Sequence, residues 1–304
     1  HDALPIYVFY GNRRSRQENT GMGGNLPSGT RKIQKRTEKN MTDHYSDTEL
    51  IEKVKEKIAS ADKVLIGLGE EWKRGISDDR ELLSAYDSLY ELIKDKDYFI
   101  VTMAVDGMIF DTALGSRMDR TVSSEPEPEE TFSCPSADSE TMALMDRLFP
   151  PKEQKRPEQD TRFQRIVAPC GNENWRQCSE GCTKDIWEPG EIPDDICPHC
   201  GAPLTGNTIQ ATPYIEEGYL PQWEKYTQWL TKTLNRELVI LELGCGFENP
   251  GVIRFPFEKT CFFNQKSFFC RVHKTFPQTS AELGERAVGV KAFSPEWIRK
   301  FVVK

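Results

Sequence analysis

The feature that most constrains the fold of this chain is a cysteine-rich segment, residues 169–207, which holds five of the nine cysteines. Within it Cys178 and Cys182 form a C-x3-C pair, and Cys197 and Cys200 form a C-x2-C pair. Each pair can aim two sulfur atoms from one tight turn at a common point, and four thiolates so placed are typical ligands of structural zinc. The spacing therefore predicts a zinc-binding module with these four cysteines as its ligands.

Two other interpretations of these cysteines are weaker. Disulfides need an oxidising compartment, which an odd number of cysteines and the lack of a secretory signal pattern disfavour. A catalytic zinc needs an open position, and four protein ligands leave none. His199 lies between two of the expected ligands and is expected to face solvent rather than to replace a cysteine. The fifth sulfur of the segment, Cys170, lies outside both pairs.

Length and charge set broad limits. A chain of 304 residues is long enough for one large domain with a small inserted module. Its formal net charge of -8 disfavours general nucleic-acid binding, which needs a basic face. No run approaches the roughly eighteen apolar residues of a membrane span, so none is expected. Without a signal pattern the expected location is cytoplasmic.

Two segments are expected to lie outside the ordered fold. Residues 1–44 are predicted to form a disordered basic tail, because the first forty contain eight Lys and Arg against three acidic residues and little apolar material. Residues 112–164 form an acidic insertion rich in proline and serine, predicted to be a largely disordered surface loop. A partner-binding role for this insertion stays open.

The remaining chain alternates helix and strand patterns. Ser46 to Glu49 reads as a capping box that starts a helix, and a closing helix is expected with Ser294 as its cap. Amphipathic periodicity indicates further helices at residues 82–93 and 226–234. Short apolar runs predict buried strands at Lys63–Gly67, Tyr98–Met103 and Leu238–Leu243, with a weaker one at Ala287–Ala292. This alternation predicts an α/β fold, a Rossmann-like parallel sheet domain with an inserted small zinc-ribbon module.

The predicted domain boundaries follow from these patterns. The Rossmann-like domain comprises residues 45–111, returns at 165–170 and ends with 207–304, while the zinc-binding module spans 171–206.

Three turns follow apolar strands and carry the predicted chemistry: Gly67 to Glu70, Thr102 to Gly107, and Gly244 to Phe247. A parallel sheet binds its ligands at the carboxyl ends of its strands, where glycine turns expose backbone amides to phosphate groups. The joint placement of the three turns therefore predicts nucleotide binding.

This order of parts resembles the sirtuin family of NAD-dependent protein deacylases, over roughly residues 50–110 and 166–303. The family's Gly-Ala-Gly-x-Ser loop, Thr-Gln-Asn-x-Asp-Gly segment and Gly-Thr-Ser turn correspond to the three turns above, and a His-Gly pair precedes its zinc module. An asparagine of the family contacts the adenine-side ribose, and Asn264 in CFFNQK resembles it. The resemblance implies NAD as cofactor, held by Gly67, Gly69, Thr102, Asp106, Gly244, Gly246 and Asn264.

Several positions depart from the family's pattern. Glu71 stands where the family has serine, and Met103 and Ala104 replace glutamine and asparagine. Cys170 takes the place of the histidine that serves as general base. The resemblance implies catalytic parts for Asp106, which would orient the nicotinamide, and for Cys170 in the base's place. A thiol acts as a base only if its thiolate is stabilised.

Two functions are predicted. The first is a sirtuin-like NAD-dependent protein lysine deacylase or ADP-ribosyltransferase of weakened or altered activity, with an acylated or ADP-ribosylated protein as partner. The second is a catalytically inactive sirtuin-fold module that binds NAD, ADP-ribose or a protein partner. Arg254, Glu258 and Lys259 indicate either a defined polar site or an ion-paired loop.

Overall fold

The computed structural model describes residues 46–115 and 165–302. The predicted basic tail and residues 116–164 of the predicted acidic insertion lie outside the described residues. Among the described residues, no helix has the length and apolar character that crossing a membrane requires.

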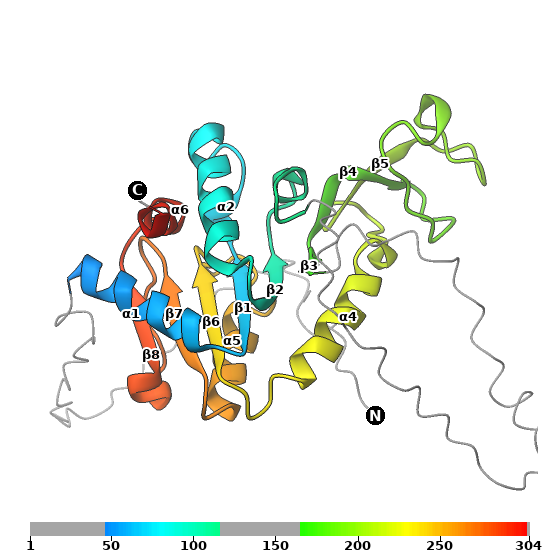
Figure 1. The fold of residues 1–304 in the computed structure, drawn as a ribbon. Helices are drawn as coiled ribbons and strands as arrows, with labels where there is room; N and C mark the ends of the chain where they lie inside the picture. The colour runs from blue at the N-terminus through cyan, green and yellow to red at the C-terminus, as the bar shows by residue number, and fades with distance from the viewer. Residues whose placement is uncertain (1–45, 116–164, 303–304) are drawn as a thin grey trace, which may run out of the picture.

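A six-stranded parallel sheet forms the centre of the fold, in the order β3-β2-β1-β6-β7-β8 (Figure 1). Its strands are β1 (Lys63–Leu68), β2 (Asp97–Thr102), β3 (Ile166–Val167), β6 (Leu238–Leu243), β7 (Phe268–Val272) and β8 (Ala287–Val290). The apolar runs at β1, β2 and β6 are buried as predicted, because strands covered on both faces need continuous apolar sequence. Strand β7 was not predicted.

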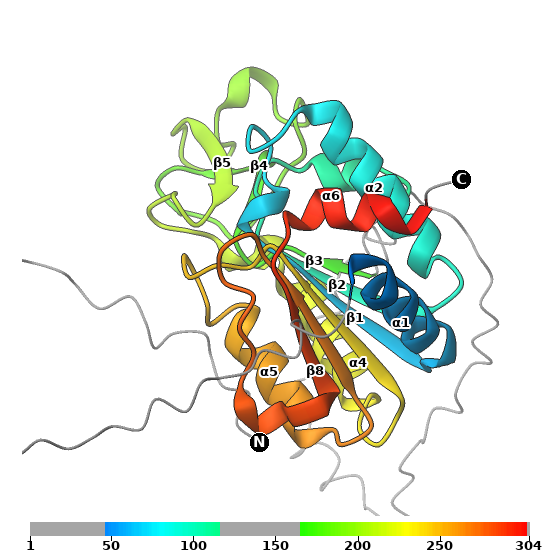
Figure 2. The ribbon, with the colours of Figure 1, turned by 90° about the vertical axis from the view of Figure 1, so that its left-hand side faces the viewer.

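Helices cover both faces of the sheet (Figure 2). Helices α1 (Asp47–Ser60), α2 (Asp79–Ile93) and α6 (Ser294–Arg299) pack on one face, while α4 (Leu220–Thr231) and α5 (Arg254–Phe263) pack on the other. Alternate residues of β1 enter the two apolar cores: Val64 and Ile66 lie on the side of α1 and α2, and Leu65 lies on the side of α4 and α5. These layers confirm the predicted α/β class.

Short 3₁₀ turns connect these elements: η2 (Glu70–Trp72), η3 (Met108–Asp111), η4 (Pro193–Asp195), η5 (Glu216–Gly218), η6 (Ala281–Arg286) and η7 (Lys300–Val302).

Two predicted helix caps have different outcomes. The capping box at Ser46 is confirmed: its Oγ accepts from the Glu49 N–H at 3.3 Å, and its own N–H donates to Glu49 Oε2 at 2.7 Å. The predicted Ser294 cap is wrong, because Ser294 is the first helical residue of α6. Its N–H donates to Glu71 Oε2 at 2.8 Å, so a carboxylate from the loop after β1 caps this helix.

The cysteine module is a separate unit between β3 and α4. Its strands β4 (Gly171–Cys178) and β5 (Leu204–Thr208) pair antiparallel and form a two-stranded sheet of their own. Figure 1 shows this sheet beyond the β3 edge of the main sheet. The module is therefore an insertion into the parallel sheet domain, as the sequence predicts.

Candidate functional site

The strand order reverses between β1 and β6, and such a reversal predicts a ligand crevice at the carboxyl ends of these two strands. From these neighbours the chain runs outward in opposite directions, through β2 and β3 on one side and through β7 and β8 on the other. The loops that follow β1 and β6 therefore lead to opposite halves of the sheet, and such a topological switch point is where open α/β sheets bind ligands. Two predicted turns meet there: the Gly69 N–H donates to Leu243 O at 2.9 Å.

Glycine is required where the two loops touch. A side chain at Gly69 would place its Cβ 2.4 Å from both the carbonyl oxygen of Gly244 and the Cα of Cys245. Gly244 has a φ of +68°, in the left-handed region that favours glycine, and a Cβ there would lie 2.5 Å from the Cβ of Glu71. Backbone therefore packs directly on backbone at the switch point.

Glu71 turns away from the crevice and into the protein. It is 2% exposed, and its two carboxylate oxygens accept from the Lys274 N–H at 3.0 Å and the Ser294 N–H at 2.8 Å. The acidic residue in the place of the family's serine is thus a structural anchor that joins the loop after β1 to the start of α6 and to the loop after β7.

The side chain of Glu70 instead contacts the loop that follows β6. Its Oε2 accepts from the Gly246 N–H at 2.5 Å, and its Oε1 accepts from the Glu248 N–H at 3.2 Å. Lys73 adds a second link between the same loops through an ion pair with Glu248, Nζ to Oε2 at 2.5 Å. Amides that a glycine turn would offer to a phosphate group are therefore already bonded to a carboxylate.

The segment after β2 contributes one carboxylate that bonds to the loop after β1. Asp106 accepts from the Arg74 N–H at 2.7 Å through Oδ2 and from the Met108 N–H at 2.9 Å through Oδ1, so it fixes the β1 loop against η3. Thr102 is buried at the end of β2, and its hydroxyl accepts from the Ala104 N–H at 3.2 Å. Met103 is also buried, as is Ala104, and neither side chain offers a polar group.

Cys170 is a buried, neutral thiol. It follows β3 and is 3% exposed. Burial raises the pKa of its thiol to about 11, with a further increase from Glu70 and Glu248 that Lys73 opposes. At neutral pH the thiol is therefore protonated, and a protonated thiol does not accept a proton as a general base would.

Asn264 does not join the other predicted site residues. Its Nδ2 donates to Thr233 O at 3.0 Å and to Arg236 O at 3.1 Å, so it fastens the end of α5 to the turn that precedes β6. That turn lies at the amino-terminal end of the strands, the end opposite to the glycine loops. Asn264 is the C-cap residue of α5, apart from the glycine loops, and its part in holding NAD stays a prediction.

The residue at the carboxyl end of β7 is His273. Its Nδ1 accepts from the Thr275 N–H and the Phe276 N–H, both at 2.9 Å, and so fixes the loop that carries Phe276. Burial lowers the pKa of His273, against the opposing charges of Glu71 and Glu70. The sequence reasoning missed this histidine because it did not recognise β7.

Two aromatic rings lie exposed beside the β6 loop. Phe247 is 55% exposed and Phe276 is 39% exposed, and their centroids are 5.1 Å apart at an interplanar angle of 79°. The Arg254 guanidinium stacks 4.5 Å from the Phe247 ring. An exposed aromatic pair at the mouth of a crevice can receive another planar group.

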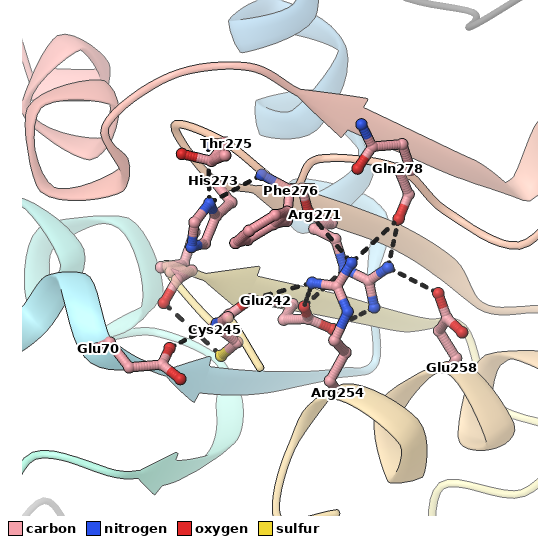
Figure 3. Close-up of polar contacts among 12 residues, drawn as sticks. Glu70, Glu242, Cys245, Arg254, Glu258, Arg271, His273, Thr275, Phe276 and Gln278 are labelled. Carbon is pink, nitrogen blue, oxygen red and sulfur yellow. Dashed lines mark hydrogen bonds and ion pairs between the residues drawn. The ribbon is translucent and has the colours of Figure 1, made fainter. Parts of the chain in front are cut away.

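A buried ion cluster supports this edge of the site (Figure 3). Glu242 accepts from Arg271 Nε at 2.6 Å and Nη2 at 2.8 Å, and Arg254 Nη1 lies 3.4 Å from the same carboxylate. Glu258 pairs with Arg271 Nη1 at 2.7 Å. Arg254 also donates to Cys245 O at 3.0 Å and so holds the β6 loop. Of the two interpretations of Arg254 and Glu258, the structure supports the ion-paired one, because both side chains belong to this cluster of ion pairs.

The charges of this cluster balance one another. Burial raises the pKa of Glu242, while its hydrogen bonds to Arg271 and the positive charges of both arginines act in the opposite direction. Burial lowers the pKa of Arg271, but bonding to Glu242 outweighs it and the pKa is raised. Two guanidiniums and two carboxylates therefore form a neutral unit in the interior.

The four predicted ligand cysteines meet at one point. The sulfurs of Cys178, Cys182, Cys197 and Cys200 all lie within 4.8 Å of one another. The separation of Sγ atoms is 3.5 Å for Cys178 and Cys200 and 3.6 Å for Cys182 and Cys197. Bonds of about 2.3 Å to a central zinc would require sulfurs about 3.8 Å apart, so the cluster fits a tetrahedral metal site. His199 bonds Asp185 instead, Nε2 to Oδ2 at 2.9 Å.

Comparisons with known proteins yield partial similarities. No family model matches the chain. A probable bifunctional ADP-ribose hydrolase/ADP-ribosyltransferase of Fusarium oxysporum f. sp. cubense is 36% identical over 83 residues, which is 25% of this chain and 13% of that protein. Two solved structures of variants of a Sir2 homologue in complex with ADP-ribose are similar at TM-scores of 0.45 and 0.41. Each is 12% identical and covers 83% of this chain and 94% of the other.

The fold itself agrees with the order of parts that the sirtuin resemblance implies. A glycine loop follows the central strand β1, a four-cysteine module is inserted after β3, and a second glycine turn follows β6. The places of the glycine turns and of the four-cysteine module in the chain therefore agree with the order that the sequence predicts.

Proposed function

We propose that this protein binds NAD or ADP-ribose in the crevice between β1 and β6 and transfers ADP-ribosyl groups. The observation that carries the proposal is the meeting of the two glycine loops at the switch point, where backbone packs directly on backbone. The probable bifunctional ADP-ribose hydrolase/ADP-ribosyltransferase that shares 36% identity over 83 residues supports chemistry on an ADP-ribose group.

Transfer fits the site better than deacylation. In the sirtuin family a histidine helps to activate a ribose hydroxyl, and Cys170 stands in its place. A thiol with a pKa of about 11 is a poor base at neutral pH. Loss of nicotinamide from NAD, with an acceptor taking the ribose, does not need that activated hydroxyl. The proposal therefore assigns this chain a transfer reaction whose acceptor is a protein side chain.

Phe247 and Phe276 have the position expected of an adenine contact. They lie at the carboxyl ends of β6 and β7, beside the loop whose amides would face the phosphates. An exposed ring can stack on a base at about 1–3 kcal/mol per contact. We propose that Phe247 contributes such a stacking contact to bound ADP-ribose.

A binding module without turnover is the second candidate. Two observations favour it: the buried Met103 and Ala104 offer no polar group where the family has glutamine and asparagine, and Glu70 fills the amides of the β6 loop. Such a module would bind NAD or ADP-ribose and release no nicotinamide.

One set of measurements separates these functions. Calorimetry with NAD and ADP-ribose measures binding, and chromatography measures nicotinamide release in the presence of acylated and unmodified proteins. Transfer predicts nicotinamide release and labelled protein, and it predicts that Cys170→Ala retains the release because the neutral thiol is not the base. Loss of release in Cys170→Ala, with NAD binding intact, would instead make Cys170 catalytic. Absence of binding to either ligand would refute both functions.

We further propose that the four-cysteine cluster holds one structural zinc. Thiolates are the ligands that zinc prefers, and the sulfur separations fit its tetrahedral geometry. Elemental analysis of carefully prepared protein is expected to find about one zinc per chain.

A further inference from the structure

The Glu70 carboxylate accepts hydrogen bonds from a pair of backbone N–H groups at the switch point. Both of its oxygens accept a backbone N–H, one from Gly246 and one from Glu248, on the loop that leaves β6 at the switch point. The contact is close: a Cβ built on Gly246 would lie 3.3 Å from Glu70 Oε2. Figure 3 shows Glu70 directed at this loop beside Cys245.

A phosphate group and a carboxylate compete for such donors because both present two anionic oxygens at similar separation. Backbone amides after a strand favour negative charge, and each charge-assisted bond is stronger than a neutral one. The amide of Gly246 cannot serve Glu70 and a ligand oxygen at full strength at the same time. A phosphate that approaches the β6 loop must therefore displace Glu70.

Glu70 can leave without dismantling the fold. Its neighbour Glu71 is anchored by two backbone amides from outside the crevice, so the loop after β1 keeps its position when the Glu70 side chain rotates. Glu70 is half-buried, which leaves it a path to solvent. The Lys73 to Glu248 ion pair lies beside it and would remain as the second link between the loops.

We propose that Glu70 is an internal competitor of phosphate, a specificity-determining residue that lowers the affinity of the crevice for phosphate-bearing ligands until it is displaced. This inference deepens the proposed function and rests on it for the identity of the nucleotide. The competition itself concerns only an anion and two amides. It explains how glycine loops suited to a nucleotide coexist with an acidic residue between them.

The test titrates inorganic pyrophosphate, ADP-ribose and adenosine into the wild type, Glu70→Ala and Glu70→Gln by calorimetry. Pyrophosphate and ADP-ribose are expected to bind Glu70→Ala about ten- to a hundredfold more tightly than the wild type. Glu70→Gln is expected to fall between them, because its amide oxygen can still accept one of the two N–H groups. Adenosine carries no phosphate, so its affinity is expected to be the same in all three proteins.

A matched control removes one negative charge elsewhere. Glu52 is an exposed carboxylate on α1 that pairs with Lys55 at 3.0 Å, and Glu52→Gln is expected to bind all three ligands like the wild type. Pyrophosphate that binds Glu70→Ala no more tightly than the wild type overturns the proposal. Tighter binding of pyrophosphate to Glu70→Ala, without any binding of ADP-ribose, supports the competition between Glu70 and phosphate but refutes the nucleotide function.

A second measurement covers the case in which Glu70→Ala does not fold. Nuclear magnetic resonance of the ¹⁵N-labelled wild-type chain follows the backbone amides of Gly246 and Glu248 during a pyrophosphate titration. Both resonances are expected to shift together as Glu70 is displaced. Pyrophosphate binding that leaves these two amides unchanged would show that the anion occupies a different place, which contradicts the proposal.

Discussion

Replacement of Glu242 by glutamine tests how much the buried ion cluster contributes to the free energy of unfolding. Glu242 is fully buried and receives two hydrogen bonds from Arg271 with a third, longer one from Arg254. Glutamine keeps the shape of the side chain but loses the charge, and its NH₂ group would face an arginine donor. Of the two carboxylates in the cluster, Glu258 alone would then remain to balance the charges of Arg254 and Arg271. Removing one partner from a buried ion pair costs about 3–5 kcal/mol.

The expected loss of stability can be measured by urea and thermal unfolding, with tryptophan fluorescence as the signal. For a domain of roughly 150–250 residues, 1 kcal/mol changes the Tm by about 2–4 °C, so Glu242→Gln is expected to lower it by about 6–20 °C. Glu258→Gln is the matched control. Its carboxylate is 24% exposed and makes one bond to Arg271, so a loss of about 1 kcal/mol is expected. Equal losses in the two variants would refute the argument that burial makes Glu242 decisive.

Three further predictions concern the site and the module. Phe247→Ala is expected to weaken ADP-ribose binding by about 5- to 150-fold through loss of stacking, while Phe255→Ala, equally exposed on α5, leaves calorimetric affinity unchanged. Because the folded-state pKa of His273 lies below its ordinary value of 6.5, the unfolded chain binds the proton more readily. Stability is therefore expected to fall as the pH drops below about 6.5, and His273→Asn, which keeps an acceptor without titrating, should flatten that part of the unfolding profile. An unchanged profile would contradict the assignment. Chelation of zinc is expected to abolish the ordered cysteine module, seen by circular dichroism and proteolysis, and a chelated protein with an intact module would refute a structural metal.

Much of the architecture could be predicted because it depends on residues that are close together in the sequence. The strands that begin at Lys63, Asp97 and Leu238 are apolar runs, and the four cysteines of the module can be recognised from their spacing alone. The capping box at Ser46 involves residues only three positions apart. Such features depend on neighbours in the chain, so a sequence pattern contains the information needed to find them.

The contacts of the site residues were harder to predict, because their partners are distant in sequence. Glu70 bonds to an amide 176 residues away, and Glu71 bonds to one 223 residues away, so no local pattern distinguishes the carboxylate in the crevice from the one that caps a helix. Asn264 is a related case. Its amide bonds to carbonyl groups 28 and 31 residues away, so no local pattern shows that it lies at the end of α5 and apart from the glycine loops.

The position of β1 at the middle of the sheet has a consequence for synthesis on the ribosome. One edge of β1 pairs with β2 soon after both emerge, but its other edge pairs with β6, and the bond from the Glu237 N–H to Asp62 Oδ2 at that junction spans 175 residues. At about 5–20 residues per second, those residues take roughly 9–35 s to translate. During that interval the nascent chain presents an apolar, unpaired edge. A trapping experiment on stalled nascent chains is therefore expected to find chaperone contact that ends once β6 has emerged.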